Sequence, residues 1–351
     1  MGIATGRFVI DMHVHSQRHA VRWKERGEKP DFVELSKTMG GSVAYDNSPR
    51  LLYDMERYGV DMCLLLRGPG MGDPLNAETA KKNPDKFLAL CAASEYVDSV
   101  RRGEREWSIR DCCVELDRLL GSGDFIGIGE SMPINPIFDP YEMPSWEKRF
   151  DEICQIMEVA RAHKVPVGWH TGGASGYGGR QRPLASRVLG EAGNPLLAHD
   201  AAAAFPDVPL IMWHGGMDGW WSEMLLEPCW HVAAAHPNVY LETGQYWAEL
   251  YEKPLRDPNI GVEKLLWGTD WGAAHPQQWW PGGHPVLYFD QSRKEGVPAH
   301  QVDIFGWSLR QLDKLDIPQD DLNLILGGNT VRVFRLEDRM PHSRLFKQYL
   351  R

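Results

Sequence analysis

The sequence predicts an α/β fold: a (β/α)8 TIM barrel with long βα loops and additional C-terminal helices, in a single domain over residues 1–351. Eight short apolar runs alternate with helix-like segments, which is the order of elements in this fold. Polar residues stand at the C-terminal ends of most of these runs, where barrel active sites gather. A doubly wound parallel sheet shows the same alternation, but the polar strand ends favour the barrel.

The predicted strands are almost continuously apolar, as parallel strands are when both of their faces are covered. Each is short enough to be a strand rather than a buried helix. They cover residues 7–13, 60–67, 86–94, 124–130, 165–171, 208–214, 238–243 and 264–270.

Helical periodicity is clearest in residues 150–164, whose apolar side chains fall on one stripe. Residues 108–120 and 48–59 also read as helices, and the second of these ends at Gly59, a natural C-cap. After residue 298 the chain adds terminal helices, which we expect to cover one side of the barrel.

Three loops after predicted strands are longer than usual, at residues 16–47, 171–194 and 271–297. The glycine-rich stretch 172–183 reads either as a mobile flap or as disorder. Because long loops at a barrel mouth usually line the site, we favour the flap.

Composition places the chain among soluble globular proteins. The hydrophobic fraction is 43% and the charged fraction is 25%, while the formal net charge of −10 argues against nucleic acid or an anionic membrane as partner. We see no apolar stretch of signal-peptide or membrane-spanning length, and the six scattered cysteines include no CxxC pair. A cytoplasmic location with reduced thiols is therefore expected.

The strand ends carry a set of side chains typical of a metal site. His13 and His15 lie two residues apart on one strand, so both imidazoles face the same side. His170, His214 and Asp270 follow at the ends of later strands. Any one of these histidines alone reads more simply as a hydrogen-bonded core residue. Together they predict a divalent metal ion, because imidazole and carboxylate suit zinc and similar ions.

Three charged residues at other strand ends are candidate substrate contacts: Arg67, Glu130 and Glu242. An arginine at an inner, apolar position is costly unless it is paired. Arg67 therefore either forms a salt bridge with Glu130 or Glu242, or clamps a substrate carboxylate. The residues leave both alternatives open.

Aromatic side chains are abundant near these strand ends. Trp271, Tyr246 and residues 279–280 are expected in loops over the mouth, where they can stack on a flat substrate. Trp169 and Trp213 each neighbour a candidate ligand, so strand alternation predicts that they point away from the barrel interior. His275 is either a further substrate contact or a surface residue.

Five stretches carry a resemblance to the amidohydrolase superfamily. The chain is most similar to its amidohydrolase-2 branch, which includes aminocarboxymuconate-semialdehyde decarboxylase and γ-resorcylate decarboxylase. The stretches are "DMHVH" at 11–15, "GWHTG" at 168–172, "IMWHGG" at 211–216, "LLWGTDW" at 265–271 and "ILGGNTVRVFRL" at 325–336.

The resemblance implies roles for the strand-end residues. His13, His15, His170 and Asp270 would hold one divalent ion, zinc in first place and manganese as the alternative. His214 would handle protons beside it. Many members of the superfamily carry a bridging lysine after the fourth strand, where this chain has Glu130. That difference favours one ion, although a glutamate can also bridge two.

The expected function is non-oxidative decarboxylation of a small aromatic or unsaturated carboxylic acid. Its substrate contacts would be Arg67, Glu130, Glu242, Trp271 and His275. The alternative on the same scaffold is hydrolysis of a lactone, amide or related bond, with His214 or Asp270 as base. Hydration of an unsaturated acid and a non-catalytic barrel are weaker alternatives. A homodimer is implied by the resemblance alone.

Overall fold

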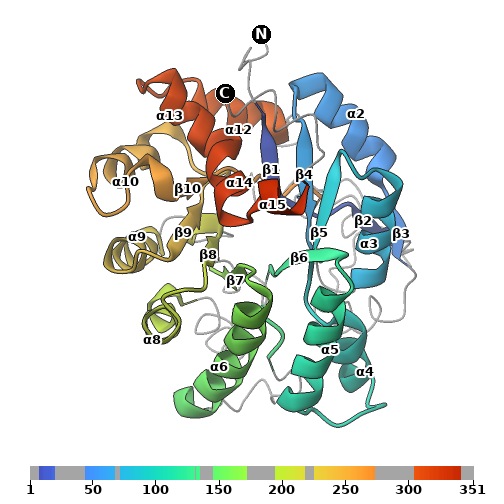
Figure 1. The fold of residues 1–351 in the computed structure, drawn as a ribbon. Helices are drawn as coiled ribbons and strands as arrows, with labels where there is room; N and C mark the ends of the chain where they lie inside the picture. The colour runs from blue at the N-terminus through green and yellow to red at the C-terminus, as the bar shows by residue number, and fades with distance from the viewer. Residues whose placement is uncertain are drawn as a thin grey trace, which may run out of the picture.

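Eight parallel strands form the centre of the molecule in a computed structural model (Figure 1). The structure describes residues 8–19, 44–67, 72–130, 132–134, 145–171, 194–217, 225–272 and 304–340. Every strand overlaps a predicted apolar run and pairs with its neighbours in chain order. In that order they are β1 (Ile10–Val14), β4 (Met62–Leu65), β5 (Phe87–Cys91), β6 (Phe125–Ile128), β7 (Val167–His170), β8 (Leu210–Trp213), β9 (Val239–Glu242) and β10 (Leu265–Leu266).

The sheet closes on itself between β10 and β1, which confirms the predicted barrel. The backbone N–H of Met12 donates to the carbonyl of Trp267 at 3.1 Å, and that of His15 donates to the carbonyl of Trp271 at 2.7 Å. A parallel bridge also joins Val14 to Trp271. These contacts fix the end of β1 beside the segment that follows β10.

Helices surround the ring of strands (Figure 1). The predicted helices over 48–59, 108–120 and 150–164 are confirmed, and Gly59 adopts a φ of 70° as the C-cap of the first. The outer helices are α2 (Ser48–Tyr58), α3 (Asp73–Lys82), α4 (Ser94–Arg101), α5 (Ile109–Gly121), α6 (Trp146–His163), α8 (Ala198–Ala204), α9 (Leu226–Ala235), α10 (Glu252–Arg256), α12 (Ile304–Leu312) and α13 (Gln319–Asn323). A short antiparallel hairpin, β2 (Gln17–His19) with β3 (Ala44–Asp46), follows β1.

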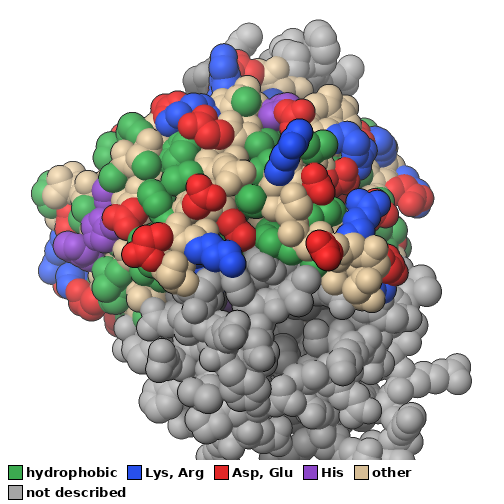
Figure 2. All heavy atoms as spheres, turned by 90° about the horizontal axis from the view of Figure 1, so that it is seen from below, with side chains coloured by type: hydrophobic (Ala, Val, Ile, Leu, Met, Phe, Trp, Pro, Cys, Tyr) green, Lys and Arg blue, Asp and Glu red, His purple; other side chains and the backbone are tan. Residues whose placement is uncertain are grey.

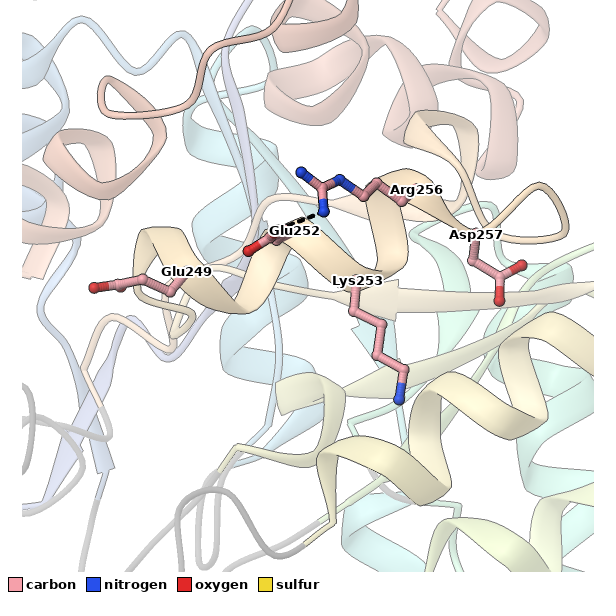
Figure 3. Close-up of a pocket in the computed structure, with 5 residues that line it drawn as sticks. All are labelled: Glu249, Glu252, Lys253, Arg256 and Asp257. Carbon is pink, nitrogen blue, oxygen red and sulfur yellow. Dashed lines mark ion pairs between the residues drawn. The ribbon is translucent and has the colours of Figure 1, made fainter.

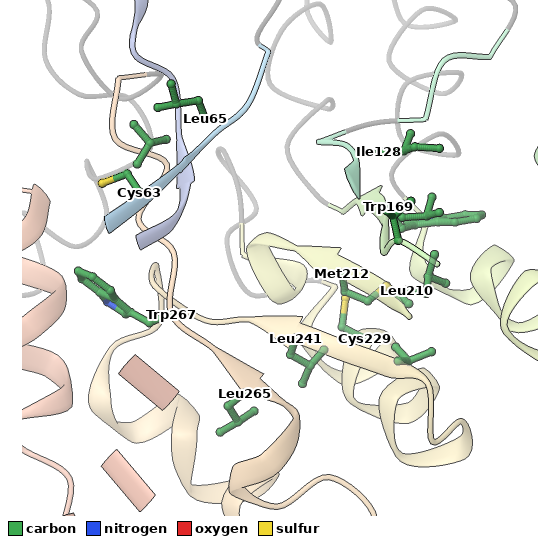
Figure 4. Packing of buried hydrophobic residues seen from close by; sticks show 14 of the residues in the cluster. Cys63, Leu65, Ile128, Trp169, Leu210, Met212, Cys229, Leu241, Leu265 and Trp267 are labelled. Carbon is green, nitrogen blue, oxygen red and sulfur yellow. The ribbon is translucent and has the colours of Figure 1, made fainter. Parts of the chain in front are cut away.

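Buried apolar side chains form two layers. Along β4, Cys63 and Leu65 pack with the outer helices, whereas Met62 and Leu64 belong to the cluster that fills the barrel. Figure 4 shows part of the outer layer, with side chains from several strands. The strict alternation is the period of two that a strand imposes.

The last two helices of the described residues, α14 (Asn329–Val333) and α15 (Leu336–Arg339), lie across the middle of the ring in Figure 1. Val331, Phe334 and Leu336 pack into the interior cluster together with Phe8, which stands just before β1. The C-terminal segment therefore closes the amino-terminal end of the barrel, and the opposite end is left for the strand-end residues.

On the described part of the face in Figure 2, acidic, basic and apolar side chains are mixed. Among the described residues, none of the helices has the length and apolar character needed to span a lipid bilayer.

Candidate metal centre

Six side chains from five strand ends converge at the carboxyl end of the barrel. Each belongs to one of the last two residues of a strand or to one of the four residues that follow it. They are His13 and His15 from β1, Glu130 after β6, His170 at the end of β7, His214 after β8 and Asp270 after β10.

Glu130 lies at the centre of this group. Its Oε1 is 3.2 Å from Nε2 of His170 and 3.1 Å from Nε2 of His214, and its Oε2 is 3.5 Å from Nε2 of His15. Burial acts to raise the pKa of Glu130, but the imidazoles, His170 foremost, outweigh it and hold the pKa well below its usual value. Glu130 is therefore a carboxylate at neutral pH.

Asp270 supplies the second carboxylate. Its Oδ1 is 3.2 Å from Nε2 of His15 and 3.5 Å from Nε2 of His13. Its Oδ2 accepts a long hydrogen bond of 3.5 Å from Nε2 of Gln245. The two histidine Nε2 atoms are themselves only 3.3 Å apart.

The hydrogen bonds of the other ring nitrogens fix the tautomers of this pair. Nδ1 of His15 donates to the carbonyl oxygen of Leu66 at 3.2 Å, and Nδ1 of His13 faces Oε2 of Glu242 at 3.2 Å. In the neutral rings both Nε2 atoms then carry lone pairs, and they face each other and two carboxylates. Such a concentration of acceptors fits a bound cation.

The pKa directions agree with this interpretation. Burial lowers the pKa of His13 to about 3, which keeps its ring neutral as a metal ligand requires. Burial also acts to lower the pKa of His15, but Asp270 and Glu130 outweigh it and the pKa is raised. The acceptors around His15 thus stabilise positive charge at this position.

Backbone conformation brings the later side chains into the site. His214 and Asp270 have φ values of 63° and 57°, in the left-handed region that residues with a Cβ rarely adopt. Trp213 already points inward, and its ring centre is 4.9 Å from that of His13. The left-handed turn at His214 allows two consecutive side chains to face the same side.

The inward position of Trp213 corrects the sequence expectation that it points away from the interior. Strand alternation does predict the orientation of Trp169, which packs in the outer layer as expected. Trp213 differs because the regular strand ends at this residue, so the alternation no longer places its successor on the opposite face.

Glu242 was expected to contact substrate, but it lies behind His13. Its carboxylate is fully buried and accepts hydrogen bonds from the backbone N–H of His214 at 2.7 Å and of Gly244 at 2.8 Å. It faces Nδ1 of His13, whereas Glu130 and Asp270 face Nε2. Burial raises the pKa of Glu242 to about 7. This position suits orientation of the His13 ring rather than contact with a substrate.

Trp271 is a second correction. Its indole Nε1 donates to Oδ2 of Asp54 in α2 at 3.1 Å, and the ring packs in the outer layer at 1% exposure. The side chain therefore lies on the helical side of the strands, where it cannot stack on a ligand in the mouth. Tyr246 is likewise fully buried, with its hydroxyl donating to the carbonyl of Gly215 at 2.6 Å.

Arg67 forms an ion pair, but not with either predicted partner. Its Nη2 is 3.6 Å from Oδ1 of Asp98 in α4. Its charge also acts on Asp73 at the start of α3, where burial raises the carboxyl pKa and Arg67 opposes the rise. Asp98 and Asp73 lie in helices α4 and α3, and no sequence motif near residue 67 indicates that these helices lie next to Arg67.

His275 lies outside the described residues, as do the glycine-rich stretch 172–183 and residues 279–280. Of the three long loops, the structure describes residues 16–19 and 44–47 of the first, 171 and 194 of the second, and 271–272 of the third.

Asp11 is a residue of the site that the sequence did not single out. Its carboxylate accepts from the backbone N–H of His13 at 2.9 Å, from that of Thr269 at 3.0 Å and from the Thr269 hydroxyl at 2.5 Å. It therefore links the end of β1 to the segment that carries Asp270. The available signal was its place in "DMHVH", two residues before the first histidine.

A shallow groove elsewhere on the surface is lined by Glu249, Glu252, Lys253, Arg256 and Asp257 (Figure 3). Both basic side chains of the groove form ion pairs, Arg256 with Glu252 and Lys253 with Glu227. None of the predicted site residues lines this groove, so the strand-end cluster is the candidate active site.

Comparison with known proteins agrees with this fold. The amidohydrolase family model matches residues 108–336, which is more than half of the chain. The chain therefore belongs to the amidohydrolase family, in agreement with the amidohydrolase-2 motifs. A search of curated proteins gives no match.

Several solved structures share the fold at low sequence identity. The 2,6-dihydroxybenzoate decarboxylase from Rhizobium has a TM-score of 0.53 at 15% identity, covering 94% of this chain and 99% of that one. A probable 2-pyrone-4,6-dicarboxylic acid hydrolase from Acinetobacter baumannii has a TM-score of 0.52 at 10% identity, covering 93% and 99%. The 5-carboxyvanillate decarboxylase from Novosphingobium aromaticivorans, complexed with manganese, has a TM-score of 0.50 at 13% identity, covering 95% and 98%.

Proposed function

We propose that this chain is a metal-dependent hydrolase of a small molecule, in which Glu130 would be a ligand shared by two divalent ions. The observation that carries the proposal is the position of Glu130 between two ligand groups. His13, His15 and Asp270 form one group, while His170 and His214 form the other with Glu130 itself. The sequence alone favoured one ion, held by His13, His15, His170 and Asp270.

The donor set suits this chemistry. Imidazole and carboxylate ligands fit zinc, with manganese as the alternative. A divalent ion at such a site supplies Lewis acidity and lowers the pKa of water to about 7.

The chain's own residues would orient the ligands and move the proton. Glu242 holds the His13 ring through Nδ1, and the Leu66 carbonyl holds that of His15. Asp270 turns Oδ1 toward the two imidazoles and Oδ2 toward Gln245. We assign Asp270 the role of general base, because its Oδ2 faces Gln245 and not the imidazoles, whereas Nε2 of His214 faces Glu130 and His170.

Non-oxidative decarboxylation is the second candidate. The amidohydrolase-2 motifs support it, and two of the neighbouring structures are named as decarboxylases of aromatic acids. In that case one ion would be bound, and His214 would deliver a proton to the substrate carbon before carbon dioxide leaves. The ion pair of Arg67 with Asp98 would compete with its binding of a substrate carboxylate.

Elemental analysis of the purified chain and of Glu130→Gln separates the two candidates. Hydrolysis with a bridged pair predicts that the substitution removes at least one strongly held ion per chain. The matched control is Glu337→Gln, an exposed glutamate on α15 that should leave metal content unchanged. Unchanged metal content in Glu130→Gln would overturn the bridging role.

A substrate screen then tests the reaction. Lactones, amides and esters should give an acid without loss of carbon, whereas aromatic acids should release no carbon dioxide. Release of carbon dioxide from an aromatic acid would establish the second candidate instead. The single domain over 1–351, homodimerisation, a cytoplasmic location and His275 as a substrate contact stay predictions.

A further inference from the structure

The turn after β8, residues 214–216, has an unusual backbone conformation. Its three residues have φ values of 63°, 54° and 92°, all in the left-handed region. Glycine adopts this region readily, but His214 carries a Cβ and its type adopts it rarely. Contacts from outside the turn must therefore hold it in the conformation that brings His214 into the candidate centre.

Thr171, the residue after His170, binds this turn on both sides of His214. Its side chain is fully buried. The hydroxyl donates to the carbonyl oxygen of Trp213 at 2.5 Å and accepts from the backbone N–H of Gly216 at 2.9 Å. One hydroxyl thus joins the residue before His214 to the second residue after it.

Other side chains hold the middle of the turn. The backbone N–H of His214 donates to Oε2 of Glu242 at 2.7 Å, and the carbonyl of Gly215 accepts from the Tyr246 hydroxyl at 2.6 Å. These contacts tie the turn to β9 and to the segment that follows it. Thr171 ties the turn to β7 instead, which is the strand that carries His170.

The position of the turn sets the geometry between two imidazoles. Nε2 of His214 is 3.2 Å from Nε2 of His170, and the two nitrogens lie 3.1 and 3.2 Å from Oε1 of Glu130. His170 pairs with Trp213 in the register of β7 and β8. A displacement of the turn relative to β7 would therefore change the distance between the two imidazoles.

We propose that Thr171 is a positioning residue of the candidate centre, whose hydroxyl holds the His214 imidazole at its distance from His170. It acts through the backbone, because both of its hydrogen bonds go to main-chain atoms. The proposal rests on the proposed function in one respect, which is that His170, His214 and Glu130 act as a ligand group.

The test compares Thr171→Val with Thr171→Ser. Valine keeps the branched shape of the side chain but removes the hydroxyl, whereas serine keeps the hydroxyl. Cobalt titration of the metal-free proteins, followed by visible absorption, reports both affinity and ligand geometry. Thr171→Val should bind cobalt roughly 10–100-fold more weakly than the wild type and with a shifted spectrum, as for other residues that support a ligand. Thr171→Ser should stay close to the wild type.

A matched control separates this role from a general effect on the fold. Thr330 is a fully buried threonine of α14, near the amino-terminal end of the barrel, so Thr330→Val should leave the cobalt spectrum unchanged. Urea unfolding of the metal-free proteins identifies the variants that are folded. If Thr171→Val does not fold, Thr171→Ala takes its place and should show the same loss of affinity.

A crystal structure of metal-free Thr171→Val keeps this proposal distinct from the proposed function. It should show a displaced turn and a distance between Nε2 of His170 and Nε2 of His214 that differs from 3.2 Å. Retention of the wild-type turn would overturn the proposal, as would an unchanged cobalt spectrum or an equal loss of affinity in Thr171→Ser. If the wild type binds no cobalt, the proposed function fails, whereas the metal-free structures still decide the role of Thr171.

Discussion

At individual positions around the candidate centre, steric packing restricts the choice of residue as much as the chemistry of the side chains does. Trp213 fills the barrel beneath His13, and its indole occupies room that only a glycine at position 168 leaves free. Left-handed backbone at His214 and Asp270 then turns their side chains to the ligand group. Strain at functional positions of this kind persists when the surrounding packing enforces it.

Gly168→Ala is expected to destabilise the protein by about 1–3 kcal/mol or more. A Cβ at this position would lie 2.1 Å from Nε1 of Trp213 and 2.5 Å from the backbone oxygen of Glu130. Urea unfolding measures the loss. Gly121→Ala at the end of α5 is the control, since its nearest neighbour would be 3.9 Å away. Equal stability of both variants would contradict the packing argument.

Glu242→Gln tests the residue behind His13. The glutamine keeps an acceptor oxygen but loses the charge that orients the His13 ring. We expect metal affinity to fall by roughly 10–100-fold while the fold is kept, as for other residues that support a ligand. Competition with a chelating dye measures the affinity. Wild-type affinity in this variant would show that the Glu242 charge is not needed to orient His13.

At the scale of elements, α14 and α15 show that packing and the candidate site lie at opposite ends of the barrel. They close the amino-terminal end of the barrel through Val331, Phe334 and Leu336, whereas the candidate ligands lie at the other end. Stability and function therefore use opposite ends of the same strands, as expected for this fold.

Phe334→Ala should lower the free energy of unfolding by about 3–5 kcal/mol, because Phe334 is fully buried in the interior cluster. Glu337→Ala on α15 is exposed and should change it by no more than about 0.5 kcal/mol. Denaturant unfolding of both variants checks the difference. A small effect of Phe334→Ala would mean that the barrel end can repack without this side chain.

Across the whole molecule, the ligand group joins strands that lie far apart in the sequence. His13, Glu130, His170 and Asp270 come from four regions of the chain and meet at one end of the barrel. A bound cation would offset the repulsion between the two carboxylates and tie these regions together.

Metal removal should therefore lower the melting temperature. Binding to the folded state alone stabilises by about 2.7 kcal/mol at a metal concentration one hundred times the dissociation constant. Differential scanning fluorimetry with and without chelator measures the shift, and added zinc or manganese should reverse it. Identical melting of the stripped and the loaded protein would argue against a structural contribution from the ion.

The sequence by itself predicted the barrel and placed five side chains of the candidate centre at its strand ends. Apolar runs and their spacing are local properties, so the eight strands could be placed without any contact information. His13, His15, His170, His214 and Asp270 followed because strand ends meet at one rim of a barrel, however far apart they lie in the chain.

Only the tertiary structure decided how the side chains turn at those ends. Glu130 lies between the ligand groups, Trp213 faces inward and Trp271 faces α2. Each orientation depends on the dihedral angles of one residue where the strand ends and on packing against distant segments. The partner of Arg67, a carboxylate of α4, was undetermined for the same reason. Strand periodicity carries no information beyond the last paired residue, and there the surrounding fold decides.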